Sequence, residues 1–246
     1  MADRKYILNC GGQEIHYSFI YPETVQHFRN FMTESSDKRC DIKIDEAYMM
    51  NHRWIVNGTV PDSYREFQCI MLATGNYLLG YKRALFHGVS FIWKNYAWII
   101  TAPSGTGKTT QYLKWHKQFK DEIQVISGDK SFIECRNDGT VWVYSSPWKG
   151  KENFGAYGKS AQLGGIIFLE QGKTNRIVRM KSDDAVLPLY LEFISYPENT
   201  NQLKNQGDIL NRILNVTPVW KLINLGDEAS AALTRKTLLE YLEDMQ

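Results

Sequence analysis

The sequence predicts a mixed α/β fold in which β-hairpins and helices surround a glycine-rich loop, and three observations lead to this prediction. An apolar run at 96–100 leads into a glycine-rich segment at 102–110 that opens a helix. Hairpin turns recur on both sides of this segment. A regular alternation of strands and helices is missing, which argues against an ordinary doubly wound sheet. The 246 residues are 43% hydrophobic and 23% charged, as is usual for a soluble globular protein.

The segment 102–110 reads Ala-Pro-Ser-Gly-Thr-Gly-Lys-Thr-Thr and has the form of a Walker-type phosphate-binding loop. Its glycines let successive N–H groups face one anion, and the helix that follows adds its positive end. Lys108 is expected to reach the β- and γ-phosphates, and the Thr109 hydroxyl to ligate Mg²⁺. The alternative is a strand-to-helix turn with a chance lysine, and Ala102 stands where the pattern has its first glycine. The expected nucleotide-binding residues are Ser104, Gly105, Thr106, Gly107, Lys108, Thr109 and Thr110.

Charge and composition limit the partners. The net charge of +2 provides no basic field, so no nucleic acid is expected as a partner. No window approaches 18 uncharged apolar residues, so no membrane span is expected. The amino terminus shows no signal-peptide pattern, and the four cysteines form no C-x-x-C pair. These features predict a cytoplasmic protein with reduced thiols.

The first sixty residues are predicted to be rich in β-structure. Apolar and polar residues alternate over 15–21 and again over 42–44, which indicates two strands. Between them, 24–33 is expected to form a short helix and 34–37 a loop.

A helix is then expected from Ser63, because Pro61 precedes it and Ser63-x-x-Glu66 has the form of a capping box. The chain is therefore predicted to consist of a β-rich N-terminal subdomain at 1–60 and a loop-bearing catalytic domain at 61–246, or of one continuous globule. The apolar face of the helix would consist of Phe67, Ile70, Met71 and Leu78.

The residues before the glycine loop are predicted to form a hairpin. One strand is expected at 85–93 and a second at 97–101, with a turn at 94–95 between them. The second strand runs directly into the loop. The helix after the loop has apolar residues at spacings of three and four, namely Tyr112, Trp115 and Phe119.

The second half of the chain also mixes strands and helices. A strand is expected at 123–127, followed by a hairpin of 131–135 and 140–144 around the Asn-Asp-Gly turn at 137–139. The remaining elements are expected as a polar loop at 145–160, a strand at 165–170, helices at 182–195, 201–213 and 228–244, and a strand at 219–223.

Three groups of side chains outside the loop are candidates for the chemistry. Asp129 ends an apolar strand 21 residues after Lys108, where a carboxylate is suited to binding Mg²⁺; the alternative is a helix-cap or turn aspartate. His87 lies on the strand before the loop, and its alternative role is that of an ordinary core histidine. The aromatic and glycine-rich segment after 145 is a candidate substrate or phosphate loop, or else a solvated loop with one aromatic anchor. Its candidate residues are Trp148, Lys149 and Lys151.

Taken together, the segments 86–91, 99–109 and 127–129 resemble the catalytic domain of bacterial HPr serine kinase/phosphorylases. Those enzymes have a His-Gly pair a short hairpin before their phosphate-binding loop and an aspartate after it. Phosphoenolpyruvate carboxykinases have a similar loop and share the fold. The resemblance covers roughly residues 80–225 and implies a curved mixed β-core flanked by helices. It also implies that His87 faces the transferred phosphate or a metal, and that the protein forms a homo-oligomer.

The chain departs from this family at one point that matters for catalysis. HPr kinases have two adjacent aspartates after the loop, whereas Asp129 stands between Gly128 and Lys130. We expect a kinase that uses ATP and Mg²⁺ to phosphorylate a hydroxyl of a peptide, protein or small molecule. A role in peptide modification is what the resemblance implies, since some HPr-kinase-related proteins act in it. In such a kinase, Lys108 would neutralise the phosphoryl group, and Asp129 or His87 would orient or deprotonate the acceptor. The alternative is an ATP-binding regulatory or interaction protein that has lost catalysis.

Overall fold

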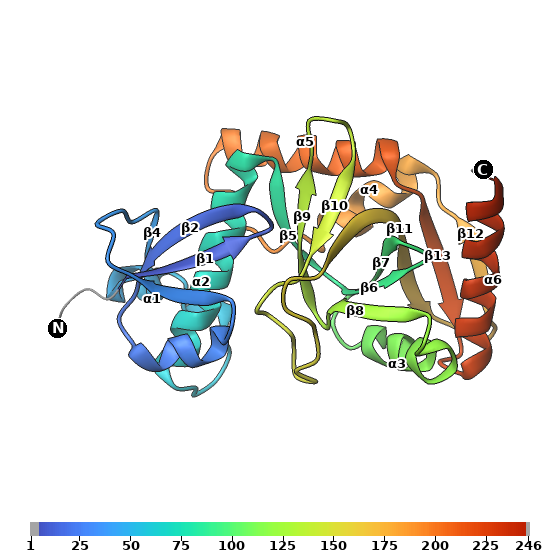
Figure 1. Ribbon diagram of the computed structural model, residues 1–246, viewed down its shortest axis with the longest axis horizontal. Helices are drawn as coiled ribbons and strands as arrows, with labels where there is room; N and C mark the ends of the chain where they lie inside the picture. The colour runs from blue at the N-terminus through green and yellow to red at the C-terminus, as the bar shows by residue number, and fades with distance from the viewer. Residues whose placement is uncertain (1–4, 245–246) are drawn as a thin grey trace.

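The computed structural model describes residues 5–244, which form two β-sheets with helices packed on them (Figure 1). Within this range the smaller sheet has four strands in the order β3-β1-β2-β4. The larger sheet has nine strands, seven of which follow the order β5-β9-β10-β11-β7-β6-β8, while β13 pairs with β11 and β12. The chain therefore has the mixed α/β architecture predicted from the sequence.

The small sheet is built on a hairpin of β1 (Lys5–Cys10) and β2 (Gln13–Ser18), flanked by β3 (Met32–Ser35) and β4 (Ile42–Lys43). The strand expected at 15–21 is present but begins earlier, and β1 was not predicted.

The helix expected at 24–33 is wrong, because the chain winds only into a short 3₁₀-helix, η1 (Pro22–Phe28), and is extended again in β3. The β-branched Thr24 and Val25 disfavour an α-helix here. In addition, the Thr24 hydroxyl oxygen lies 3.1 Å from the backbone oxygen of Ser63, which places the turn against another part of the chain.

The smaller helices α1 (Glu46–Asn51) and η2 (Arg53–Ile55) lead to α2 (Asp62–Leu78). The predicted start of α2 after Pro61 is confirmed, but the capping box is wrong. The fully buried Glu66 carboxylate accepts hydrogen bonds from the N–H groups of Ile20 and Tyr21 and from the Thr24 hydroxyl. These donors lie just past the end of β2, so they bind Glu66 in place of a strand partner.

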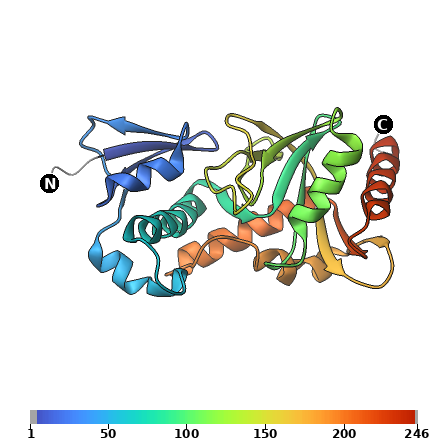
Figure 2. The ribbon, with the colours of Figure 1, turned by 90° about the horizontal axis from the view of Figure 1, so that it is seen from below.

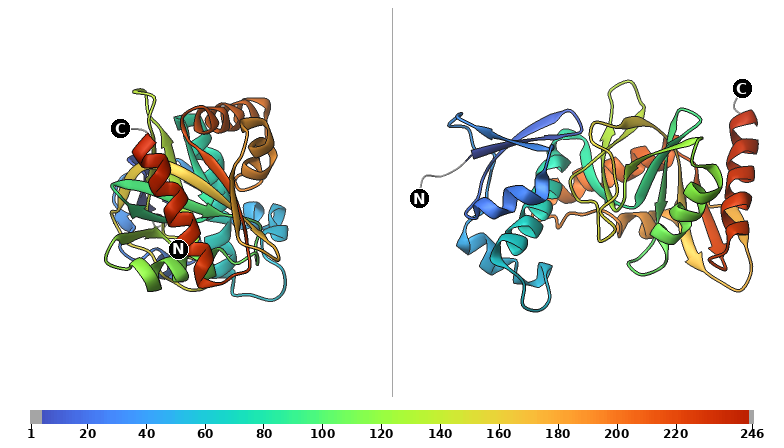
Figure 3. Two further views of the ribbon diagram at one scale, coloured as in Figure 1. Left: turned by 90° about the vertical axis from the view of Figure 1, so that its right-hand side faces the viewer. Right: turned by 60° about the horizontal axis from the view of Figure 1, so that its bottom comes forward.

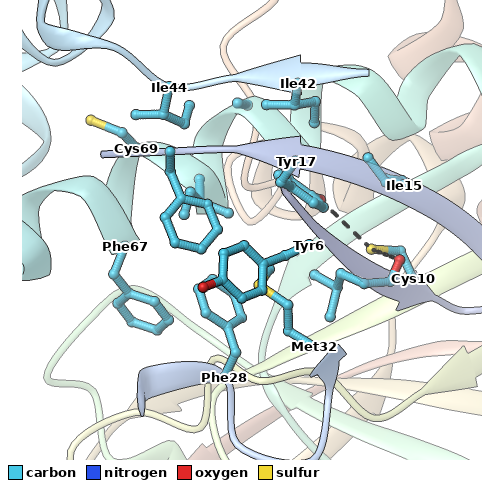
Figure 4. Close-up of a cluster of buried hydrophobic side chains, with 14 of the residues drawn as sticks. Tyr6, Cys10, Ile15, Tyr17, Phe28, Met32, Ile42, Ile44, Phe67 and Cys69 are labelled. Atoms are coloured by element: carbon cyan, nitrogen blue, oxygen red, sulfur yellow. Dashed lines mark hydrogen bonds between the residues drawn. The ribbon is translucent and has the colours of Figure 1, made fainter. Parts of the chain in front are cut away.

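Helix α2 packs against the small sheet and forms its core with it. Figure 4 shows the aromatic side chains of Tyr6 and Phe28 beside Phe67 of α2. The Tyr17 hydroxyl reaches Thr74 of the same helix at 2.7 Å. The core of the small sheet thus includes a helix beyond residue 60, and the division into domains at that residue stays a prediction.

The strand expected at 85–93 is in fact two strands, β5 (Arg83–His87) and β6 (Val89–Trp93). β5 pairs with β9, whereas β6 pairs with β7 (Tyr96–Thr101) and β8 (Ile123–Ser127). The break falls at Gly88, where a Cβ atom would lie 2.6 Å from Ile99 Cγ2. The strand pairing therefore changes at Gly88, because a glycine has no side chain that would collide with β7.

Both predicted hairpins are confirmed. Lys94 and Asn95 have φ angles of 51° and 67°, as a type I′ turn requires. The second hairpin joins β9 (Lys130–Cys135) to β10 (Val141–Tyr144).

Three strands of the larger sheet run parallel and end at the same edge. They are β7, β11 (Ser160–Gln171) and β13 (Val219–Asn224), with β11 between the other two. The strand expected at 165–170 is thus the second half of a longer one. The edge strand β12 (Arg176–Arg179), which pairs with β13, was not predicted.

Helices cover both faces of the larger sheet (Figures 2 and 3). On one face α3 (Lys108–Phe119) and α6 (Glu228–Asp244) pack in a cluster that includes Ile100, while on the other α4 (Ser182–Tyr190) and α5 (Thr200–Val216) pack in a cluster that includes Ile99. Neighbouring residues of β7 thus point to opposite faces, as in any strand buried on both sides. Within residues 5–244 no helix has the length and apolar character needed to cross a membrane.

The buried carboxylate of Glu66 provides a test of how the turn after β2 is stabilised. Glu66→Ala leaves the N–H groups of Ile20 and Tyr21 without this acceptor, and a buried donor without a partner costs about 1–3 kcal/mol. We expect the free energy of unfolding, measured by urea titration, to fall by about 3 kcal/mol. Glu23→Ala, which changes an exposed acid of η1, is the control and should change it by less than about 0.5 kcal/mol. Equal effects of the two substitutions would contradict this role of Glu66.

Candidate functional site

The glycine loop, residues 102–107, connects the end of β7 to the first turn of α3. Gly105 and Gly107 have φ angles of 82° and 106°, in the left-handed region that favours glycine. Lys108 opens the helix, and its ammonium group donates to the backbone oxygens of Ala102 at 2.7 Å and Pro103 at 3.3 Å. The lysine therefore folds back across the loop, with its charged end inside the curve.

Ala102 does not strain this loop. It is fully buried, and it is not among the residues with a positive φ angle in the described part of the chain. An alanine is compatible with such a backbone, which explains why a methyl group is tolerated where the usual pattern has glycine.

Lys108 is only 7% exposed, and burial lowers the pKa of its ammonium group. The carboxylates of Glu192 and Asp129 act in the opposite direction, and Lys130 adds to the lowering. The site thus contains several charged groups close to the loop.

His87 and Asp129 meet at the ends of neighbouring strands. His87 is the last residue of β5, and Asp129 lies between β8 and β9. The N–H of Gly88 donates to the backbone oxygen of Asp129 at 2.7 Å, which joins the two segments. His87 Nε2 lies 3.3 Å from Asp129 Oδ1, and the other carboxylate oxygen of Asp129 contacts the ammonium group of Lys130.

The other ring nitrogen of His87 is bound to a residue that the sequence did not single out. His87 Nδ1 lies 2.7 Å from Glu192 Oε2, and the Glu192 side chain is almost fully buried. Glu192 reaches this position because the backbone after α4 pairs with β5. The N–H of His87 donates to the Glu192 backbone oxygen at 2.8 Å, and the N–H of Ile194 donates to Leu85 at 2.8 Å.

The helix expected at 182–195 is therefore wrong at its end, because α4 stops at Tyr190. Pro188 lies in its last turn and cannot donate a backbone hydrogen bond there. One signal of the extended segment is present in the sequence: Glu192 is a lone acid between apolar residues, followed by Phe193 and Ile194.

The charged groups of this cluster stabilise one another's ionised forms. Burial acts to lower the pKa of His87, but the hydrogen bonds with Asp129 and Glu192 outweigh it and raise this pKa. Burial acts to raise the pKa of Asp129, but the bond with His87 and the charge of Lys130 outweigh it and lower this pKa to about 2. The arrangement favours an imidazolium ring between two carboxylates.

The loop 145–159 packs directly over Asp129. A Cβ atom on Gly128 would lie 2.5 Å from the backbone oxygen of Phe154, and one on Gly150 would lie 2.8 Å from Asp129 Cβ. Lys149 lies with its ammonium group 5.7 Å from the ring of Phe31, and Lys151 is exposed. Both lysines are thus at the rim of the site.

Trp148 serves as the anchor of this loop. It is 3% exposed and makes edge contacts with Phe28 and Phe132, at ring distances of 5.8 and 6.0 Å. It also packs against Phe67 of α2, with the ring centroids 6.1 Å apart. The tryptophan connects the loop to the core of the small sheet, so most of its surface is not free for a ligand.

These elements enclose a cavity of about 730 Å³. One wall comes from the larger sheet and the loops, and the other comes from η1 and α2, through His27, Tyr64, Phe67, Gln68 and Met71. The structure brings most of the predicted site residues to this cavity: Ser104, Gly105, Gly107, Lys108, Thr109, His87, Asp129, Trp148, Lys149 and Lys151. Thr106 and Thr110 line a second cavity on the other side of the loop. The wall from η1 and α2 was not foreseen.

Comparisons with known proteins add little to this picture. No model of a protein family matches the chain, and no curated protein sequence matches it. The solved structure of the Hpr(Ser) kinase/phosphatase from Coxiella burnetii is similar to part of it, with 13% identity, 53% of this chain and 97% of that chain covered, and a TM-score of 0.30. At this TM-score the similarity says nothing about function, and the function is inferred below from the residues of the site.

The link between Glu192 and His87 is testable by titration. Glu192→Gln removes one of the two negative charges beside the ring, so the pKa of His87 should fall, as measured by NMR of the imidazole protons. Since this pKa is raised, the interaction stabilises the fold fully below the ordinary value of about 6.5 and is lost as the pH rises through the raised value. Glu198→Gln, which changes an exposed acid beside His52, is the control and should leave His87 unchanged. A pKa of His87 that is the same in Glu192→Gln would contradict the assignment.

Proposed function

We propose that this protein is a phosphotransferase that uses ATP and Mg²⁺ to phosphorylate a hydroxyl group. One observation carries the proposal: a glycine loop with a buried lysine inside its curve opens onto the same cavity as a paired histidine and aspartate. Phosphoryl transfer needs these two parts together, one to bind the phosphates and one to orient the acceptor.

In this proposal the phosphates bind at the glycine loop. The backbone N–H groups of 104–110 face the β-phosphate, at the positive end of α3. The ammonium group of Lys108, which now bonds to the loop carbonyls, would exchange these neutral acceptors for phosphate oxygens. The lowered pKa of Lys108 fits a group buried without a full counter-charge, which an anionic ligand would supply.

The donor set fits a magnesium ion. Thr109 offers a hydroxyl and Asp129 a carboxylate on the same cavity, and Mg²⁺ is commonly bound by one or two carboxylates together with phosphate oxygens and waters. A cluster of three or more histidine, cysteine or acidic side chains suited to a metal is not found in residues 5–244. Because Lys130 now contacts Asp129, it would move to the phosphates when the ion binds. The bound ion would supply charge neutralisation on the transferred group.

Asp129 would orient the acceptor rather than act as a strong base. A carboxylate whose pKa is about 2 binds a proton weakly, far from the range that suits general base catalysis. Phosphoryl transfer tolerates this, since its loose transition state depends mainly on position and charge. His87, fixed by Glu192, contributes positive charge beside the transferred group, and Lys149 or Lys151 would close over it.

The acceptor would enter between the glycine loop and the wall formed by η1 and α2. Aromatic side chains line this wall, with the rings of His27 and Phe67 stacked 4.7 Å apart and Tyr64 37% exposed. Such a surface suits a peptide or a ring-bearing molecule. A hydroxyl on a peptide is therefore our preferred acceptor, in keeping with a role in peptide modification.

A non-catalytic ATP-binding protein is the second candidate, and one observation favours it. Among residues 5–244, Asp129 is the single carboxylate that faces His87 Nε2, and two cationic groups already engage it. Glu192 adds a second carboxylate, but it faces the other ring nitrogen and is buried. It therefore fixes the histidine and does not replace the missing neighbouring aspartate.

Transfer of label separates the two candidates. The protein is incubated with γ-labelled ATP, Mg²⁺ and a library of peptides that contain serine or threonine, and the label is followed on peptide and in water. We expect incorporation into a subset of peptides, and none with Lys108→Ala, because that variant loses the charge at the phosphates. Lys120→Ala, an exposed lysine at the end of the same helix, should behave as wild type. ATP binding with no label on any acceptor or in water would favour the regulatory candidate.

Asp129→Asn tests the role of the carboxylate. The substitution keeps the shape but removes the charge, so ATP binding should persist while Mg²⁺-dependent transfer falls by about 10²–10³-fold. Single-turnover measurements with labelled ATP would show the loss. Asp121→Asn, at an exposed turn, is the matched control. Full activity in Asp129→Asn would exclude Asp129 from both metal binding and acceptor orientation.

A further inference from the structure

A second cavity adjoins the glycine loop on the side away from His87 and Asp129. Its volume is about 290 Å³, near the lower end of the range of about 300–1,000 Å³ that small-molecule sites span. Gly107 lines both cavities, so they meet at the loop. A ligand bound by the loop could therefore extend into both.

The second cavity lies at the edge where the three parallel strands of the larger sheet end. β7 ends at the glycine loop, β11 ends at Gln171 and β13 ends at Asn224, and the cavity is lined by residues of that loop and of the ends of β11 and β13. In open α/β sheets, ligands bind in the crevice outside the carboxyl ends of parallel strands. The position of this cavity is thus one where a ligand is expected on general grounds.

A buried polar side chain in this cavity lacks a hydrogen-bond partner. Gln111 on α3 is 2% exposed, and one of its amide atoms lies 2.8 Å from the Ser230 hydroxyl oxygen. The other amide atom has no partner within residues 5–244. The Ser230 hydroxyl also lies 2.7 Å from the backbone oxygen of Asp227, and it has only one proton to donate. Whichever amide atom of Gln111 faces Ser230, the other remains free for a ligand.

The chemistry of the lining suits a neutral group better than a further phosphate. None of the lining residues in the described range has a charged side chain. The lining offers amide and hydroxyl groups from Thr110, Gln171 and Asn224 and an apolar surface from Leu225, which is 55% exposed. A neutral, partly apolar ligand with a few polar atoms matches these groups.

We propose that this cavity binds the nucleoside of the nucleotide, that is, its base and ribose. This inference rests on the proposed function, since it assumes that a nucleoside triphosphate binds at the loop. The γ-phosphate would then face Asp129 in the larger cavity, and the chain of phosphates would pass over Gly107 and α3 to the base. Gln111 would donate to, or accept from, a polar atom of the base or ribose.

The test compares ATP with inorganic tripolyphosphate, which has the phosphates without the nucleoside. Isothermal titration should show that the wild-type protein binds ATP more tightly. In Gln111→Leu the affinity for ATP should fall about tenfold, the effect of one lost hydrogen bond in a dry site, while the affinity for tripolyphosphate stays the same. Gln118→Leu is the matched control on the same helix, because Gln118 bonds to the Glu228 backbone oxygen and does not line the cavity.

Each other outcome of this titration overturns the proposal. Equal affinities for ATP and tripolyphosphate in the wild type would exclude a nucleoside subsite but leave phosphate binding at the loop intact. The same loss of affinity for both ligands in Gln111→Leu would assign Gln111 to the fold of the loop. If neither ligand binds the wild type, the proposed function fails together with the subsite.

A second measurement uses only the unmodified protein. Photolabelling with azido-ATP, followed by trypsin digestion, should mark the peptide 222–235, which contains Asn224, Leu225 and Gly226. Excess ATP should prevent the labelling. Label on the peptide 152–159, at the larger cavity, would overturn the proposal, and so would labelling that ATP does not prevent.

Discussion

The shared position of His87 between Glu192 and Asp129 is the constraint on which the rest of this site depends. Charged groups with little solvent contact cost several kcal/mol each unless they are paired. Pairing all three requires the end of β5, the extended segment after α4 and the β8–β9 junction to meet within hydrogen-bonding distance. The charge cluster therefore fixes three distant parts of the chain beside the glycine loop, and any shift of one part would leave a charge unpaired.

Close approach of backbone segments makes this meeting possible. Gly88 allows β5 to separate from β6 against Ile99, and Gly128 allows the loop 145–159 to lie on the aspartate. The same loop is anchored through Trp148 in the core of the small sheet. The small sheet therefore contributes to the site, because its core fixes the position of the loop 145–159 that lies over Asp129. This explains why η1 and α2 form one wall of the cavity.

The sequence predicted those parts of the site that depend on local order along the chain. The loop, Lys108, the hairpin before it and the strand before Asp129 follow from residue types at short spacing. It did not predict Glu192, because its role arises from a backbone pairing with residues more than one hundred positions away. The capping box at Ser63 and Glu66 failed for the same reason. Ser63 and Glu66 match the local pattern of a capping box, but the Glu66 carboxylate accepts hydrogen bonds from the N–H groups of Ile20 and Tyr21, which are distant in the sequence.

The two cavities beside the loop differ in charge, and this difference gives a nucleotide one preferred direction. The larger cavity contains Lys108, Lys130, Lys149 and Lys151, together with the ring of His87, against few acids. The smaller contains no charged side chain among the described residues. A triphosphate carries its charge at one end and its neutral, ring-bearing part at the other. Reversing it would place phosphates against Leu225 and leave the lysines facing a base, so electrostatics and desolvation both favour the orientation with the γ-phosphate beside Asp129.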